Sequence, residues 1–187
     1  MIIKNEIPIL EYDDSSLEVI TPNHGNEDLE LPEKCLFAFL GDVVHNYAKE
    51  HDAEIANEYI TVSHNVNVYI LHEEEEDICL VQPTIGAPAA TGLMDFLVNC
   101  GCKKVIAVGS CGVLADIPEN AFLVPTRALR GEGTSYQYLP ASRYIELDEE
   151  PISVIENCFK SIAAYIVFEL VFTVGPDRFA VSEHTVF

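Results

Sequence analysis

The chain has 187 residues, of which 49% are hydrophobic, and its 10 basic and 31 acidic side chains give a net charge of -21. This length suits a single domain with a continuous apolar core, whereas so negative a chain repels phosphodiester backbones and anionic lipid headgroups. We therefore expect neither nucleic acid nor membranes as partners. A phosphate site on this chain needs backbone N–H groups or a few well-placed arginines to be locally positive.

The cysteines and the first residues bear on the compartment and on metal binding. Six cysteines stand in apolar segments, and residues 1–10 contain no basic stretch followed by a cleavable apolar one. No apolar run reaches the roughly 18 residues of a membrane-spanning helix. We expect a cytoplasmic protein with reduced thiols. Cys100 and Cys102 do not form a CxxC pair, and no second pair stands nearby, so we expect no metal site.

The chain divides by composition into a polar arm, residues 1–34, and a domain, residues 35–187. The apolar run 35–40 ends at Gly41 and is typical of a strand that is covered on both faces. Apolar residues at helical spacing then predict a helix from Asp42 onwards.

A strand–helix–strand unit is predicted in the middle of the chain. A helix that Gly101 ends as a C-terminal cap stands between an apolar strand, 78–81, and another, 105–108. This order predicts a βαβ unit with parallel strands. Further strands are predicted at 59–62, 66–71, 121–124, 126–129 and 165–173, and a further helix from Pro151 to Ile162.

Two small-residue loops follow the strands of this unit. The first contains Gly86, Ala87 and Pro88, and the second is Gly109-Ser110-Cys111-Gly112. Each loop is also explained by a tight turn alone, because such a turn needs small residues. Two donor-rich bends at the carboxyl edge of one parallel sheet, however, also favour an anion pocket.

Three segments, 86–90, 104–114 and 124–140, together resemble the nucleoside phosphorylase family, and most of all its uridine and purine phosphorylase branch. The resemblance implies an α/β three-layer sandwich with a mixed central sheet. It also implies phosphorolysis of a purine or pyrimidine nucleoside to the free base and ribose 1-phosphate, with phosphate as co-substrate, no cofactor and a homo-oligomeric assembly.

The resemblance also assigns roles to residues. It places Gly41 in a first phosphate loop, Gly86, Ala87 and Pro88 near sugar and phosphate, and Ser110 as a phosphate donor. Gly109, Cys111 and Gly112 complete the loop of Ser110, and Arg130 joins the substrate-binding residues in a base-proximal or subunit-contact region.

Two departures from the family pattern leave the activity open. Many phosphorylases have an arginine three residues before the hydroxyl of the second loop, and here that position is Ala107. The Met-Glu pair that grips the ribose is absent, so we expect the C-terminal elements of the fold to be missing. Asp177 resembles a catalytic aspartate of the family.

The alternatives to a phosphorylase are a nucleosidase that uses water and a catalytically impaired, truncated remnant that binds nucleoside or phosphate or only self-associates. A dinucleotide-binding module is disfavoured, because no Gly-x-Gly-x-x-Gly follows a strand.

Overall fold

A computed structural model describes residues 2–15, 19–112, 116, 118, 121–161, 166–168 and 185–186. The chain forms two compact units, Ser16–Ser110 and Met1–Ser15 with Cys111–Phe187. The first residues are therefore grouped with the C-terminal half. A boundary between an arm and a domain at residue 34 stays a prediction.

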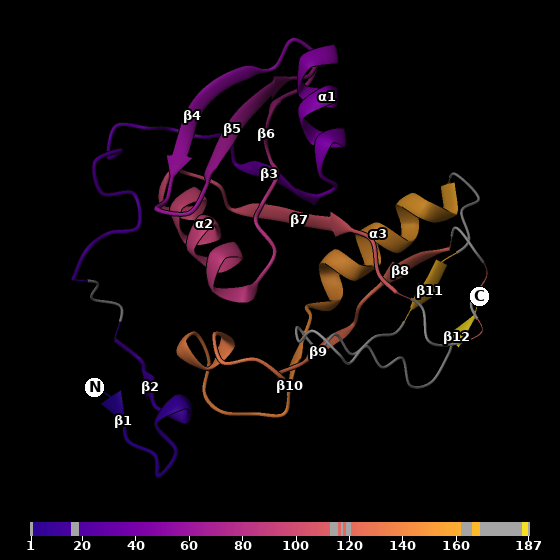
Figure 1. Ribbon diagram of the computed structural model, residues 1–187. Coiled ribbons are helices and arrows are strands. Elements are labelled where there is room, and N and C mark those ends of the chain that lie inside the picture. Colours follow the sequence, from indigo (N-terminus) through magenta and orange to yellow (C-terminus); the bar gives the residue numbers. More distant parts are fainter. Residues whose placement is uncertain are drawn as a thin grey trace. The chain divides into compact units, whose positions relative to one another are not determined.

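The unit Ser16–Ser110 is built on a five-stranded mixed sheet (Figure 1), in the order β4-β5-β6-β3-β7. Its strands are β3 (Lys34–Phe39), β4 (Glu54–Ile60), β5 (Asn65–His72), β6 (Asp77–Val81) and β7 (Lys104–Gly109). Strands β6 and β7 both pair with β3 in parallel, whereas β4 and β5 are antiparallel additions. The mixed central sheet is as predicted.

One helix covers each face of this sheet. Helix α1 (Asp42–Glu50) packs Val44 and Ala48 against one face, and α2 (Ala87–Asn99) packs Leu93, Phe96 and Leu97 against the other. Successive side chains of a strand point to opposite faces, so a strand between two helices must be apolar on both. Strand β3 meets this requirement and supplies residues to both cores. The three-layer arrangement is confirmed.

The β6–α2–β7 unit differs from the prediction in one respect. Its two strands are parallel, as expected, but they are not neighbours, because β3 lies between them. The apolar run that forms β3 is buried on both faces and therefore takes the central position. Three carboxyl ends, rather than two, consequently meet at one edge of the sheet.

The other unit contains smaller sheets. Strand β8 (Phe122–Val124) pairs in parallel with β11 (Ile166–Phe168), which pairs with β12 (Thr185–Val186), while β9 (Arg127–Leu129) pairs with β10 (Tyr144–Glu146). The remaining elements are β1 (Ile2–Ile3), η1 (Pro8–Leu10), β2 (Tyr12–Asp13), η2 (Ser135–Gln137) and α3 (Glu149–Ser161). Most of the strand predicted at 165–173 lies outside the described residues. Within the part of the chain that is described, no helix combines the length and the apolar character needed to cross a membrane.

Candidate functional site

The carboxyl ends of β3, β6 and β7 lie along one edge of the five-stranded sheet. Phe39 is in register with Gly109, and Phe37 is in register with Val81. Three loops therefore begin side by side where these strands end: the loop with Gly41, the loop with Gly86, and the loop with Gly109 and Ser110. We call this end of the parallel strands the carboxyl edge. A methyl group on Gly109 would lie 3.3 Å from the Cβ of Phe39, so the close approach of these two strands favours glycine.

Two helices begin at the carboxyl edge without a capping side chain. Gly41 (φ 59°) precedes α1 and Gly86 (φ 118°) precedes α2, and both adopt left-handed backbone conformations that favour glycine. Neither helix has a side-chain cap hydrogen bond at its N-terminus. N-terminal N–H groups and the helix dipole favour an anion there. The N-terminus of α2 has no acidic residue in its first turn, whereas α1 has Asp42, so α2 is the better anion site of the two.

The side chain of Gln82 ties two of the edge loops together. Its Oε1 accepts a hydrogen bond from the backbone N–H of Leu40 at 3.0 Å, and its Nε2 donates to the carbonyl of Pro83 at 3.1 Å. One amide therefore fixes the exit of β3 relative to the exit of β6. No periodic or motif signal in the sequence indicates this role, because a glutamine after a strand usually faces solvent.

The loop after β6 is also held by a histidine from the β4–β5 turn. Nε2 of His64 lies 2.5 Å from Oγ1 of Thr84, and its Nδ1 lies 2.8 Å from Oγ of Ser63. The predicted site contains no histidine. His64 is only partly exposed and contacts the residue two positions before Gly86. It therefore positions the loop that begins α2.

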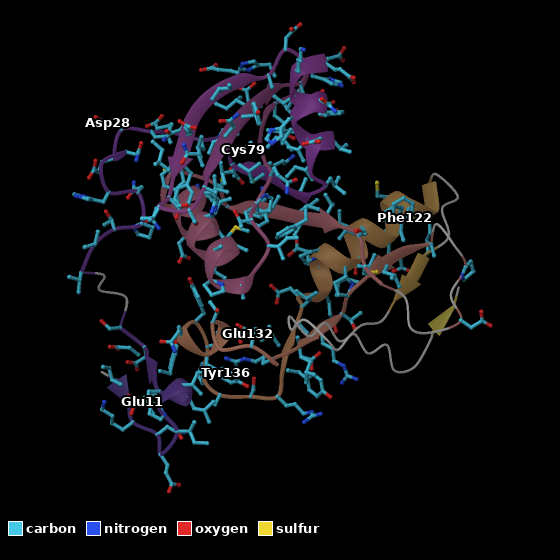
Figure 2. All side chains as sticks on the ribbon, viewed as in Figure 1. Glu11, Asp28, Cys79, Phe122, Glu132 and Tyr136 are labelled. Carbon is cyan, nitrogen blue, oxygen red and sulfur yellow. The ribbon has the colours of Figure 1, made fainter. Side chains whose placement is uncertain are left out.

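Arg130 is buried, and its side chain forms hydrogen bonds within its own unit. Arg130 is 6% exposed, and the centre of its guanidinium lies 4.2 Å from the centre of the Tyr136 ring (Figure 2 labels Tyr136). All five N–H donors of a guanidinium are engaged: they donate to Oγ and the carbonyl of Ser135, to the carbonyls of Leu139 and Pro140, and to Oγ of Ser142. The side chain thus holds the turn 135–142. Substrate binding by Arg130 stays a prediction, and it requires some of these bonds to be exchanged.

The remaining predicted residues are placed as follows. Ala87 and Pro88 form the first turn of α2, and Ser110 is exposed directly after β7. Cys111 is half-buried and Gly112 is exposed, and both belong to the unit that does not contain the five-stranded sheet. Asp177 lies outside the described residues.

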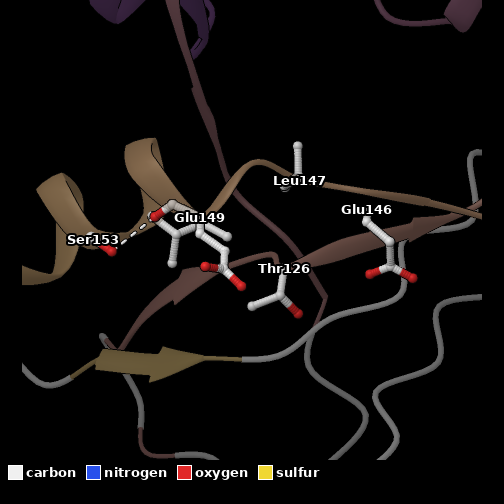
Figure 3. A pocket seen from close by; sticks show the side chains of 6 residues that line it. Thr126, Glu146, Leu147, Glu149 and Ser153 are labelled. Atoms are coloured by element: carbon white, nitrogen blue, oxygen red, sulfur yellow. Dashed lines mark hydrogen bonds between the residues drawn. The ribbon is translucent and has the colours of Figure 1, made fainter.

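A hollow in the unit that contains α3 does not suit an anion. It has a volume of about 490 Å³ and is lined by Thr126, Glu146, Leu147, Glu149, Ile152 and Ser153. Two carboxylates, on Glu146 and Glu149, line this hollow (Figure 3), and they would repel a phosphate.

Comparison with known proteins decides the family. The sequence profile of the phosphorylase superfamily matches residues 34–184, which is most of the chain. The chain belongs to the phosphorylase superfamily. No curated protein sequence matches this superfamily member significantly.

Solved structures of the superfamily share its fold. An AMP nucleosidase from Bacteroides thetaiotaomicron is 24% identical over 79% of this chain, with a TM-score of 0.62. A purine nucleoside phosphorylase from Toxoplasma gondii is 14% identical over 83% of the chain, and a uridine phosphorylase from Vibrio fischeri is 20% identical over 81%, each with a TM-score of 0.65. The matched regions cover 59%, 62% and 63% of these three proteins, respectively. The present chain therefore spans about three fifths of their length. They include both phosphorylases and a nucleosidase, and at these identities they show the fold alone.

The described part of this superfamily member offers few cations near the carboxyl edge. The edge loops 40–42, 82–89 and 109–110 contain no lysine or arginine. Lys34, Lys103 and Lys104 stand at the amino ends of strands, and Lys34 and Lys104 pair with Glu76 and Glu33. Ala107, where the family resemblance places an arginine, is exposed on β7. An anion at this edge would therefore depend on backbone donors and on Ser110.

Proposed function

We propose that the chain takes part in cleaving the glycosidic bond of a purine or pyrimidine nucleoside, with inorganic phosphate as the attacking group. Membership of the phosphorylase superfamily supports this class of reaction. The observation that carries the proposal is the convergence of Gly41, Gly86 and Gly109-Ser110 at one sheet edge, with two uncapped helix N-termini beside them.

The chemistry explains why such an edge is useful. Positive charge develops on the sugar as the bond to the base breaks, and a phosphate held beneath the sugar stabilises that charge and attacks it. The N–H groups of Ala87 and Ala89 at the start of α2 and the hydroxyl of Ser110 are the proposed phosphate donors. Gly86 allows the backbone to approach the ligand closely, because it carries no side chain.

A specific observation favours hydrolysis as a second candidate. Ala107 replaces the arginine that the family resemblance places before the second loop, and a lost charge-assisted contact weakens binding by about 1.5–3 kcal/mol. A site with weak phosphate binding lets water act as the nucleophile. An AMP nucleosidase among the structural relatives has the same fold.

The decisive experiment measures base release from inosine, adenosine and uridine with and without phosphate. Phosphate-dependent release together with ribose 1-phosphate supports phosphorolysis. Release that is independent of phosphate supports hydrolysis. If a correctly folded protein releases no base from any nucleoside, both reactions are contradicted. The remaining hypothesis is then a remnant that binds nucleoside or phosphate without catalysis or only self-associates.

Two variants sharpen this experiment. Ser110→Ala is expected to weaken phosphate binding roughly tenfold, as the loss of one hydrogen bond to a charged group does, whereas Ser153→Ala, at an exposed position of α3, serves as control. Ala107→Arg places a cation on the edge strand and is expected to strengthen phosphate binding and to raise the dependence of base release on phosphate. If both Ser110→Ala and Ala107→Arg bind phosphate as tightly as the parent chain, the second loop does not bind phosphate.

The assembly and location are proposed on the resemblance alone. We expect a homo-oligomer in the cytoplasm, without nucleic-acid or membrane partners. Light scattering on the purified chain tests the first of these, and a monomer at micromolar concentration would contradict it.

A further inference from the structure

Three buried cysteines meet in the core between the five-stranded sheet and α2. The Sγ atoms of Cys35, Cys79 and Cys102 all lie within 4.8 Å of one another. Cys35 is 4% exposed, and Cys79 and Cys102 are fully buried. Figure 2 labels Cys79 within the sheet. We call these three residues the thiol cluster.

The sheet itself brings the cluster together. Cys35 on β3 is the register partner of Cys79 on β6, so their side chains project side by side toward α2. Cys102 lies two residues before β7, on the other side of β3, and its N–H donates to the carbonyl of Leu97 at 3.0 Å. The cluster therefore stands near the amino ends of the parallel strands, at the end opposite to the carboxyl edge. Its chemistry is independent of the proposed function.

The three thiols interact with one another as well as with the apolar core. Cys102 hydrogen-bonds with both Cys35 and Cys79, and Cys35 hydrogen-bonds with Cys79. The three sulfurs are thus mutual neighbours.

We propose that Cys35, Cys79 and Cys102 form a binding site for one Cu(I) ion, coordinated by three sulfur atoms. Thiolate sulfur is a soft ligand that favours Cu(I) and Zn(II). A metal–sulfur distance of about 2.3 Å in a planar three-ligand site places the sulfurs roughly 4 Å apart, which the cluster allows with little movement.

The number of ligands selects Cu(I) over Zn(II). Structural zinc sites take four ligands, and the group in the described residues contains three. Cys100, the fourth buried cysteine of this core, lies outside the group. Monovalent copper accepts three sulfur ligands without a fourth. Each thiol that binds as thiolate releases its proton to solvent, and copper stays in the Cu(I) state throughout.

The test is a titration of the full reduced chain with Cu(I) under anaerobic conditions, in competition with a chromophoric Cu(I) chelator. The chain carries Cys111→Ser and Cys158→Ser, which remove the two cysteines outside the buried core. We expect one Cu(I) per chain. Cys79→Ala is expected to reduce this stoichiometry at least tenfold, whereas the matched core variant Cys100→Ala retains it, with circular dichroism confirming that both are folded.

The outcomes are distinct from those of the nucleoside experiment, because they do not depend on catalysis. Equal copper binding by Cys79→Ala and Cys100→Ala would overturn the proposal, as would a parent chain, with Cys111→Ser and Cys158→Ser alone, that binds no Cu(I) or binds Zn(II) more tightly than Cu(I). If Cys79→Ala does not fold, X-ray absorption at the copper edge of the loaded parent protein decides the matter. Three sulfur neighbours support the site, and nitrogen or oxygen neighbours overturn it.

Discussion

Arg130 is the residue on which the turn 135–142 depends. Replacing it with methionine keeps most of the side-chain volume but removes the Arg130 donors of the Leu139 and Pro140 carbonyls. The carbonyl of Ser135 loses one donor and keeps the backbone N–H groups of Tyr138 and Leu139. We expect Arg130→Met to lower the free energy of unfolding by about 3 kcal/mol, because each buried polar group that loses its partner is destabilising. Urea denaturation measures this.

Arg143 provides the control for Arg130. It is exposed, and its side chain contacts Tyr144 through one hydrogen bond of 3.2 Å and by lying 5.5 Å from the centre of the ring. Arg143→Met is expected to change the free energy of unfolding by less than about 0.5 kcal/mol. Equal effects of the two substitutions would show that the hydrogen bonds of Arg130 do not stabilise the unit.

Glu132 gives the same turn a pH dependence. Burial raises the pKa of its carboxyl, but hydrogen bonds from Ser135 and Thr134 outweigh burial and lower it below the ordinary value of 4.5. The N–H groups of Thr134 and Ser135 donate to the carboxylate at 2.5 Å and 3.0 Å. A lowered pKa in the folded state means that the carboxylate stabilises the fold above pH 4.5 and that this contribution is lost as the pH falls below that value.

The pH dependence is tested with Glu132→Gln. We expect this variant to be about 1 kcal/mol less stable than the parent at pH 7, since it keeps an acceptor oxygen but loses the charge. The difference should shrink as the pH falls through the range below 4.5. Unfolding by urea at pH 7 and pH 3.5 measures both values, with the exposed Glu146→Gln as control. A difference that is constant with pH would contradict the assignment.

Among the elements, α2 and the turn after it offer a matched pair of glycines. Gly101 ends the helix with φ 123°, and a Cβ there would lie 2.8 Å from the carbonyl oxygen of Leu31. Gly92 lies inside α2, where a Cβ would make an ordinary 3.6 Å contact with the hydroxyl of Tyr59. We expect Gly101→Ala to destabilise the unit Ser16–Ser110 by roughly 2–3 kcal/mol and Gly92→Ala to stabilise it by up to about 1 kcal/mol.

Thermal unfolding of both glycine variants checks this expectation through opposite shifts of Tm. A rise in Tm for both variants would contradict the expectation, because it would mean that the turn accepts a methyl group at Gly101 without strain. The backbone N–H of Leu31 donates to the carbonyl of Cys100 at 2.7 Å, so moving the turn away from Leu31 would lose this bond and lower Tm.

The elements that were predicted well from the sequence are those with strong periodicity. The strands at 66–71, 78–81 and 105–108 and the helix ended by Gly101 are present, because long apolar runs and a glycine cap are local signals. The position of β3 between β6 and β7 was not predicted. The runs that form β3, β6 and β7 are all apolar, and a local pattern does not show which strands pair with one another.

The candidate site shows the same division between local and tertiary signals. The glycine-bearing bends at Gly41, Gly86 and Gly109 were found from sequence, and the structure places them at one edge. Gln82 and His64 were missed, because their roles depend on partners 42 and 20 residues away in the chain. The thiol cluster was missed for the same reason. Its cysteines are scattered in sequence and meet only through strand register.

On the scale of the whole molecule, the net charge of -21 opposes the approach of phosphate. Salt screens this long-range repulsion, since the Debye length falls from about 30 Å at 0.01 M to about 8 Å at 0.15 M. The short contacts to backbone N–H groups proposed at the carboxyl edge lie well inside that length and are screened less. If the proposed function holds, we therefore expect phosphate to bind more tightly as the NaCl concentration rises across this range.

Isothermal titration calorimetry with phosphate at both salt concentrations measures the change, and an uncharged nucleoside serves as the control ligand. The nucleoside has no net charge, so its affinity should stay constant while that of phosphate increases. Phosphate binding that weakens with salt is the behaviour of an anion held by side-chain cations. That result would contradict a site built from the first turn of α2 and Ser110, because the edge loops contain no lysine or arginine.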